Sequence, residues 1–256
     1  MNAFKKVTLS TVDKIYSFLL LLLELFFPRE FNFSELESKV DLSIIKLRDM
    51  RHLDSYYFFS YKEKIIKDAV WELKFKNNRQ ISKIFAGIFC AFLREKILRE
   101  VEMENNYDFF DGKLDAEVDG EFILIPVPIH KRRRSERGFN QCEWLCEDII
   151  KILRKQNTRT GQRTNEINRV YEMIKYEKDI LIRNEYTQKQ SWSSRAERLE
   201  KLKGVFEVRE KFKSKITGKK IILVDDVTTT GATIKEARRT LLESGASLVI
   251  SVVIAH

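Results

Sequence analysis

The sequence has few of the residues that build metal modules, disulfide frameworks and disordered tails. Its three cysteines are Cys90, Cys142 and Cys146. The odd number, and the absence of a Cys-x-x-Cys pair, argue against a disulfide framework or a four-cysteine zinc site, so no zinc is predicted. Such cysteine usage favours a reducing, cytoplasmic setting. Only three prolines and nine glycines interrupt the chain, which excludes low-complexity disorder over most of its length.

Long apolar runs are also lacking. The most apolar segment, Ile15–Phe27, has thirteen residues and contains Glu24, whereas a membrane-spanning helix needs about 20 apolar residues. Lysines precede it as in a signal peptide, but no small-residue cleavage site follows. We therefore expect no integral membrane span and a helix buried against its own protein or a partner. Peripheral contact with a membrane is the alternative.

Charge is abundant and unbalanced. The formal net charge is +9 and the isoelectric point is about 9.3. A basic balance favours anionic partners, namely phosphates, nucleic acid or an acidic membrane surface, and does not choose among them. Lysine-rich solvated surfaces are the alternative explanation.

Hydrophobic periodicity divides the chain into a helical first part and an α/β second part. Residues 1–60 are expected to be mostly helical, residues 62–103 have apolar positions at helical spacing, and residues 104–120 are expected to form a loop. Beyond residue 120, short apolar runs alternate with helical segments, which indicates a parallel sheet covered by helices on both faces. The expected strands are 122–127, 179–184, 204–208, 219–226 and 247–255, the expected helices are 139–155 and 232–244, and 130–138, 156–178 and 185–203 are polar connections.

The most informative segment is IILVDDVTTTGAT, Ile221–Thr233. Apolar residues predict a central strand, and Asp225 and Asp226 follow at the carboxyl edge, where open α/β sheets bind ligands. Small and hydroxyl residues then lead into a helix, whose first N–H groups and dipole favour a phosphate. Adjacent carboxylates suit ribose hydroxyls and a metal ion bound to them. The predicted phosphate-binding residues are Val227, Thr228, Thr229, Thr230, Gly231, Ala232 and Thr233.

This thirteen-residue order resembles the phosphoribosyl-diphosphate (PRPP) binding motif of type I phosphoribosyltransferases. A second segment, IPVPIHKRRRSERGFNQ, resembles the signature of the ComF family, which is associated with DNA uptake in competent bacteria. Its place, after the first core strand, is where relatives bind pyrophosphate, and guanidinium groups suit phosphate oxygens. A solvated basic loop or a nucleic-acid patch is the alternative. The residues implied are Lys131, Arg132, Arg133, Arg134, Gly138, Asn140 and Gln141, together with Arg137, which with Asp225 and Asp226 forms the implied catalytic set.

Further positions match the family. Arg183, Thr187, Gln190 and Arg198 correspond to the mobile loop that closes over the substrate, whereas Lys201 stands where an Asn is frequent. Lys74 and Phe75 resemble a Lys-Phe element ahead of the core. The largest departure is N-terminal, since no cysteine precedes Cys90 and the zinc module of many members is absent. The expected organisation is a helical region, 1–60, in place of that module, and a phosphoribosyltransferase-like domain, 61–256, with its core at about 120–256.

The resemblance implies a PRPP-binding transferase that uses Mg²⁺, held at Asp225 and Asp226 indirectly through PRPP, with an acceptor that the sequence does not reveal. The alternative is a non-catalytic module that senses PRPP or a nucleotide and partners DNA-uptake proteins and single-stranded DNA. No interleaved aromatic and basic platform for single strands is visible in the sequence. A homo-oligomer is left open, as is a structural adaptor docked through the Ile15–Phe27 helix.

Overall fold

The computed structural model describes residues 31–39, 48–50, 55–105, 122–159, 172–184 and 202–256. The chain divides into two compact units, Met1–Phe33 and Ser34–His256, and the second contains the sheet and the helices that cover it. The apolar segment Ile15–Phe27 and the connection 104–120, apart from residues 104 and 105, lie outside the described residues. Among the described residues, no helix combines the length and the apolar character needed to cross a membrane.

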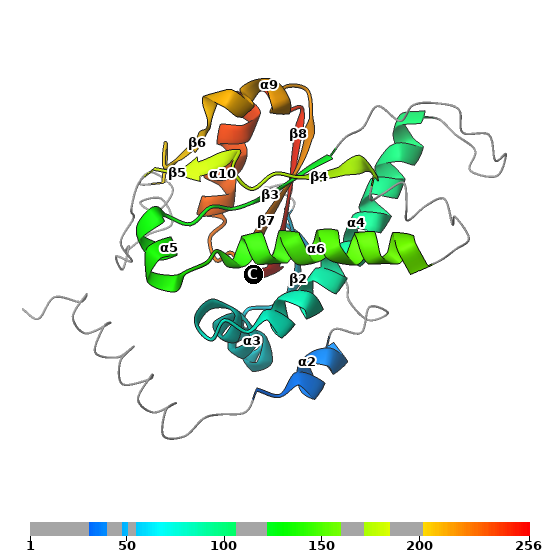
Figure 1. Cartoon of the computed structure of the whole chain (residues 1–256), viewed down its shortest axis with the longest axis vertical. Coiled ribbons are helices and arrows are strands. Elements are labelled where there is room, and N and C mark those ends of the chain that lie inside the picture. The colour runs from blue at the N-terminus through cyan, green and yellow to red at the C-terminus, as the bar shows by residue number, and fades with distance from the viewer. Residues whose placement is uncertain (1–30, 40–47, 51–54, 106–121, 160–171, 185–201) are drawn as a thin grey trace, which may run out of the picture. The chain divides into compact units, whose positions relative to one another are not determined.

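The core of the second unit is a sheet of six strands in the order β1-β2-β8-β7-β3-β4 (Figure 1). Five of these strands run parallel, and β1 pairs antiparallel with β2 at one edge. The central strand β7 lies between β8 and β3, so its backbone is paired on both sides. The strands are β1 (Arg48–Met50), β2 (Ser55–Phe59), β3 (Phe122–Pro126), β4 (Ile174–Tyr176), β7 (Lys220–Val227) and β8 (Leu248–Ala255).

Helices and a small hairpin surround this sheet. The helices are α2 (Phe33–Lys39), α3 (Lys64–Phe75), α4 (Arg79–Asn105), α5 (Lys131–Arg137), α6 (Gln141–Arg159), the 3₁₀ turn η1 (Glu210–Phe212), α9 (Lys213–Ile216) and α10 (Ala232–Glu243). The hairpin pairs β5 (Leu181–Arg183) antiparallel with β6 (Phe206–Val208).

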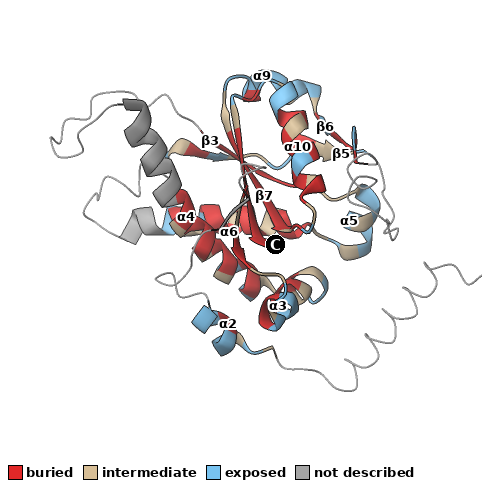
Figure 2. Cartoon of the chain, turned by 180° about the vertical axis from the view of Figure 1, so that it is seen from behind, coloured by how far each residue is buried: buried red, intermediate tan, exposed pale blue. Residues whose placement is uncertain are grey.

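The two faces of the sheet are covered by different helices. Ile221 and Leu223 of β7 belong to one buried cluster with Ile234 and Leu241 of α10. The alternate residue Ile222 is equally buried but lies outside that cluster, because successive side chains of a strand point to opposite faces. Helix α6 contacts β3 and β7 and covers this second face. Figure 2 shows the central strands buried along their length, which confirms the predicted parallel sheet with helices on both faces.

Three local predictions were wrong. Helix was expected up to residue 60, yet β1 and β2 are strands and β2 joins the main sheet. Aromatic residues favour strands, and the aromatic run of β2 packs there against α4, where the Phe58 and Phe89 ring centroids lie 5.0 Å apart. The segment 130–138 is a short helix rather than a loop. The His130 ring accepts a hydrogen bond from the Arg132 N–H (3.1 Å), and Gly138, with φ 81°, ends the helix.

The third error concerns 156–178. Helix α6 continues to Arg159, and the short edge strand β4 pairs Tyr176 with Leu124 of β3. A strand of three residues with one buried side chain, Ile174, carries too little hydrophobic pattern to be recognised in the sequence.

Candidate functional site

The carboxyl ends of β3, β7 and β8 meet at one edge of the sheet. The Thr228 N–H donates to the Ala255 carbonyl (3.1 Å), which joins the residue after β7 to the end of β8. The Val127 N–H donates to the Val224 carbonyl (2.8 Å), which joins the end of β3 to β7. The final residue, His256, lies at this edge, with its Nδ1 3.1 Å from the Thr228 carbonyl oxygen. Segments far apart in the sequence are thereby brought together.

Asp225 and Asp226, the carboxylate pair, lie at this edge and are both buried. The Asp226 N–H donates to Asp225 Oδ1 (2.9 Å), and the Cys142 thiol lies 3.4 Å from the same oxygen. The Val227 N–H donates to Asp226 Oδ1 (2.6 Å). Within the described part of the chain, these hydrogen bonds all engage the two carboxylates through Oδ1.

Burial and the neighbouring negative charge change the protonation of this pair. Burial, together with the charge of Asp226, raises the pKa of Asp225 from 3.8 to about 7, against the opposing effects of the Asp226 N–H, Lys74 and Cys142. Burial and the same carboxylates raise the pKa of the Cys142 thiol well above its ordinary value. Cys142 is therefore a neutral hydrogen-bond donor rather than a nucleophile.

Lys74, at the end of α3, forms an ion pair with one member of the carboxylate pair, Asp226. Its Nζ lies 3.0 Å from Asp226 Oδ1. Burial lowers the pKa of Lys74, but the charges of Asp226 and Asp225 more than offset this and hold it above its ordinary value. The sequence signal was the Lys-Phe element, which gave no reason to place Lys74 at the site, because the contact spans 152 positions of the chain (226 − 74).

The phosphate loop, Thr228–Thr233, follows the pair directly. The Gly231 N–H donates to Thr228 Oγ1 (3.1 Å), and Gly231 has φ 74°, a conformation that glycine adopts at no steric cost. Helix α10 begins at the next residue, so its first N–H groups and dipole face the loop. Thr228 is buried, Thr230 and Thr233 are half-buried and Thr229 is exposed. The predicted strand, loop and helix are confirmed.

Helix α5 divides the predicted basic residues into two groups. Arg132 pairs with Glu136 (3.1 Å) and Arg134 pairs with Glu143, and Lys131 is exposed. The second group consists of Arg133 and Arg137, which are both half-buried. Burial lowers the pKa of Arg137 against the attraction of Asp226, and Arg133 lowers it further.

Arg183 of β5 joins the second group. Burial lowers the pKa of Arg183, Arg133 lowers it further, and Asp225 opposes both. Arg133 thus acts electrostatically on both Arg137 and Arg183, while Asp226 acts on Arg137 and Asp225 acts on Arg183. Arg183 was predicted to belong to the mobile loop that closes over the substrate. The other residues predicted for that loop, Thr187, Gln190 and Arg198, lie outside the described residues.

Asn140 and Gln141 have structural roles beside the site. The buried Asn140 side chain donates to the Val127 carbonyl (3.1 Å) and accepts from the Cys142 N–H (3.1 Å), which fixes the start of α6 against β3. Gln141 Nε2 donates to the Lys74 carbonyl (3.3 Å), and its Oε1 lies 3.4 Å from Arg137 Nη1. Gly138 supplies the left-handed turn between α5 and α6.

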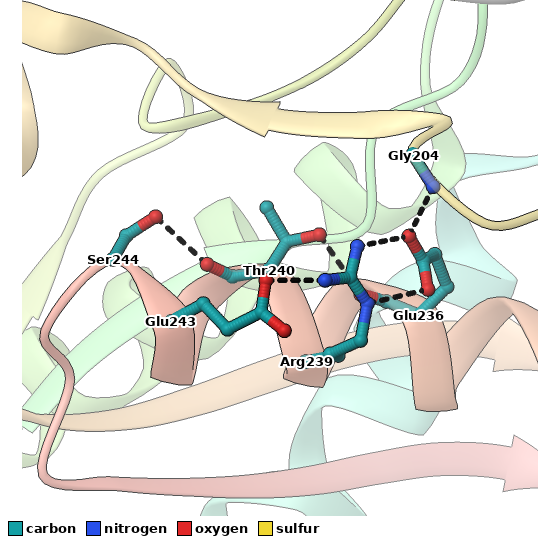
Figure 3. Close-up of polar contacts among 6 residues, drawn as sticks. All are labelled: Gly204, Glu236, Arg239, Thr240, Glu243 and Ser244. Atoms are coloured by element: carbon teal, nitrogen blue, oxygen red, sulfur yellow. Dashed lines mark hydrogen bonds and ion pairs between the residues drawn. The ribbon is translucent and has the colours of Figure 1, made fainter.

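A polar network on α10 holds a segment beside the phosphate loop. Figure 3 shows the Glu236 carboxylate accepting from the Gly204 N–H and from Arg239, whose Nε and Nη2 lie 2.9 and 2.7 Å away. Leu202, Val205 and Ala232, the first residue of α10, form a small buried cluster. The chain before β6 is therefore anchored at the start of the helix that follows the loop.

Among the described residues, no three His, Cys, Asp or Glu side chains lie together as a metal centre would require. Carboxylate oxygens are ligands that hard cations accept, but a metal ion at Asp225 and Asp226 would need further oxygens from a ligand or from water.

Comparison with known proteins gives a consistent assignment. The family model for the phosphoribosyl transferase domain matches residues 154–256. The competence protein ComFC of Bacillus subtilis is 32% identical over 160 residues, which cover 62% of this chain and 55% of the relative. The DNA utilization protein YhgH of Escherichia coli K12 is 29% identical over 126 residues (49% and 45%), and the competence protein F of Haemophilus influenzae is 29% identical over 135 residues (53% and 50%).

The chain spans about half the length of these curated relatives. The matched domain contains β7, the carboxylate pair and the phosphate loop, and the relatives share names given for competence and DNA utilization. The parallel sheet with helices on both faces agrees with the type I phosphoribosyltransferase fold. The chain is therefore similar to the ComF family of phosphoribosyltransferase-like proteins.

Proposed function

We propose that this protein binds PRPP together with Mg²⁺ at the edge formed by β7, the phosphate loop and α5, and transfers its phosphoribosyl group to an acceptor. The observation that carries the proposal is the carboxylate pair, buried and held through Oδ1 directly before a phosphate-type loop. Hydrogen-bond donors for a phosphate and hydrogen-bond acceptors for sugar hydroxyls thereby lie side by side at one sheet edge, as a phosphorylated sugar requires.

Each part of PRPP has a counterpart in this arrangement. The N–H groups at the start of α10 and the threonine hydroxyls of the loop suit the 5-phosphate. Oδ2 of Asp225 and of Asp226 would accept the two ribose hydroxyls. Arg133, Arg137 and Arg183 would attract the diphosphate, since guanidinium groups suit phosphate oxygens. Mg²⁺, when bound, would neutralise the charge that develops on the leaving diphosphate.

Transfer of the phosphoribosyl group passes through an oxocarbenium-like state. Its requirements are stabilisation of the leaving diphosphate and exact placement of the attacking atom. Arginines would supply the first, and the carboxylate pair would hold the ribose ring for the second. No residue of the described part identifies the acceptor, which remains a base, an amine or another nucleophile.

Calorimetry with PRPP and Mg²⁺ tests the proposal. Wild-type protein should bind PRPP, and Asp225→Ala/Asp226→Ala should not. The matched control is Glu210→Gln, a carboxylate whose side chain is 83% exposed on η1. Absence of binding to the wild type, or binding retained in the double variant, would refute the assignment of the site. Binding would then justify a screen of acceptors for pyrophosphate release.

A second candidate is a non-catalytic module that binds PRPP or a nucleotide as a signal and partners DNA-uptake proteins and single-stranded DNA. The structure brings Arg137 to the aromatic and basic segment that contains Trp71, Phe75 and Lys76. Phe75 is 54% exposed, and the Arg137 guanidinium carbon lies 5.2 Å from its ring centroid. Lys76 Nζ lies 5.4 Å from the Trp71 ring. Exposed aromatic rings with neighbouring cations are typical of proteins that bind single strands.

Salt dependence distinguishes this candidate. Binding of a labelled single-stranded oligonucleotide should weaken steeply between low and physiological salt, and Phe75→Ala should weaken it at every salt concentration. An oligonucleotide affinity that is unchanged in Phe75→Ala would exclude this surface as the nucleic-acid site.

A further inference from the structure

The ammonium group of Lys74 is placed against the carboxylate pair by several independent contacts. Its side chain is 23% exposed and its Nζ lies 3.0 Å from Asp226 Oδ1. The buried face of α3, which includes Val70 and Leu73, fixes the helix. Gln141 holds the Lys74 backbone carbonyl from α6. Because α3 is fixed in this way, the Lys74 ammonium group stays beside the carboxylate pair and would repel an approaching cation.

We infer that Lys74 is a positioning residue that makes the carboxylate pair a site for the vicinal diol of a sugar phosphate and prevents a divalent metal ion from binding the pair directly. The identity of the sugar phosphate rests on the proposed function. The effect of Lys74 on direct metal binding does not, because it follows from the contacts of the unliganded protein.

Charge is the first reason. Two ionised carboxylates would carry a charge of −2 and attract a divalent cation, but Lys74 reduces the charge of the group to −1. A metal ion on Asp226 would also lie close to the ammonium group, and like charges at such short range repel strongly in a buried setting. Mg²⁺ loses its water ligands reluctantly, so the residual attraction is insufficient to strip and hold it.

Geometry is the second reason. Lys74 and the Val227 N–H both donate to Oδ1 of Asp226, and the Asp226 N–H and Cys142 occupy Oδ1 of Asp225. Each carboxylate therefore presents Oδ2 in a fixed direction. Two adjacent hydroxyl groups can each donate one hydrogen bond to such a pair and bring no positive charge toward Lys74. A neutral diol thus fits where a cation does not.

Binding of Mn²⁺ without any sugar phosphate, followed by electron paramagnetic resonance, tests the first part. Wild-type protein should bind no Mn²⁺ at the pair at millimolar concentration. Lys74→Met, which has a similar length and no charge, should gain one Mn²⁺ site that is lost again when Asp226→Asn is added. Lys74→Arg, which keeps the charge, should behave like the wild type. Lys74→Gln is a second neutral variant in case Lys74→Met does not fold.

Two results of this experiment would overturn the inference. One is Mn²⁺ binding to the wild type that disappears in Asp225→Asn/Asp226→Asn, which needs no folded Lys74 variant. The other is a folded neutral variant that gains no Mn²⁺ site.

Calorimetry with PRPP and Mg²⁺ tests the second part. A neutral Lys74 variant should lose about tenfold or more in affinity, because a charge-assisted hydrogen bond that orients Asp226 is removed, and Lys74→Arg should recover part of the loss. A wild type that does not bind PRPP would refute the proposed function, while the Mn²⁺ experiment would still decide the role of Lys74. A wild type that binds PRPP as tightly as a folded neutral variant would refute the role of Lys74 alone.

Discussion

The raised pKa of Asp225 predicts that the binding site reduces the stability of the fold at neutral and alkaline pH. An acid whose pKa rises from 3.8 in the unfolded chain to about 7 in the folded protein keeps its proton in the folded state while the unfolded chain loses it. Stability from this group is complete below pH 3.8 and is lost as pH rises through about 7. Asp225→Asn keeps an Oδ1 acceptor for the Asp226 N–H and removes the charge.

The magnitude follows from the two pKa values. Relative to an Asp whose pKa is the same in both states, the raised pKa of Asp225 lowers the free energy of unfolding by roughly 4 kcal/mol at pH 8 and roughly 2 kcal/mol at pH 5. The free energy of unfolding of Asp225→Asn, relative to the wild type, should therefore increase by roughly 2–3 kcal/mol between pH 5 and pH 8. Effects of the asparagine that involve no titrating group are the same at both pH values and cancel in this difference.

Urea unfolding of both proteins at pH 5, 6, 7 and 8 measures this difference. Asp179→Asn is the matched control, because the Asp179 side chain is 52% exposed beside Arg209. A difference between wild type and Asp225→Asn that does not change with pH would refute the reasoning. The same ionisation should make PRPP bind more tightly as pH rises through about 7, because the ionised carboxylate accepts a ribose hydroxyl bond more strongly.

Three further substitutions test the structure around the site. Asn140→Ala removes a buried donor and acceptor that join α6 to β3 and should lower the free energy of unfolding by about 2 kcal/mol in urea titrations; an unchanged midpoint would contradict this. Gly231→Val places a branched side chain at φ 74° and should weaken PRPP binding in calorimetry, whereas Gly218→Val, at φ 72° far from the loop, should leave it unchanged. Glu236→Gln weakens the hydrogen bonds to Arg239 and Gly204 and should lower the free energy of unfolding by about 1–2 kcal/mol at pH 7 in urea titrations. The decrease should be smaller at pH 4, because the pKa of Glu236 is lowered in the folded protein and its contribution to stability is lost as pH falls.

The strands and helices that are long and apolar were predictable from the sequence. Strand β7 has a continuous apolar run because both of its faces are covered, and α10 is bounded by Gly231 and Gly245, which have positive φ. The phosphate loop was predictable for the same reason, since glycine, threonine and carboxylate residues follow a buried strand in a fixed order.

Features that depend on contacts between distant segments were not predictable. Strand β2 was expected to be helical, because its aromatic residues carry no alternation, and it becomes a strand by pairing with β8. The Lys74 contact with Asp226 joins α3 to β7, and no local pattern in the sequence predicts it. The end of a helix was also not predictable, since α6 extends to Arg159, beyond the predicted boundary at residue 155.

The cations of α5 show how folding separates charges that look equivalent in the sequence. Successive residues of a helix point in directions about 100° apart, so Arg132 and Arg134 turn toward Glu136 and Glu143. Arg133 and Arg137, four positions apart, share the remaining face, where like charges repel and Arg133 lowers the pKa of Arg137. Such an arrangement costs free energy in the unliganded protein, and an anion placed between the two guanidinium groups would reverse the sign of that contribution. On the proposed function, the diphosphate would therefore lie against this face of α5 rather than along the whole basic segment.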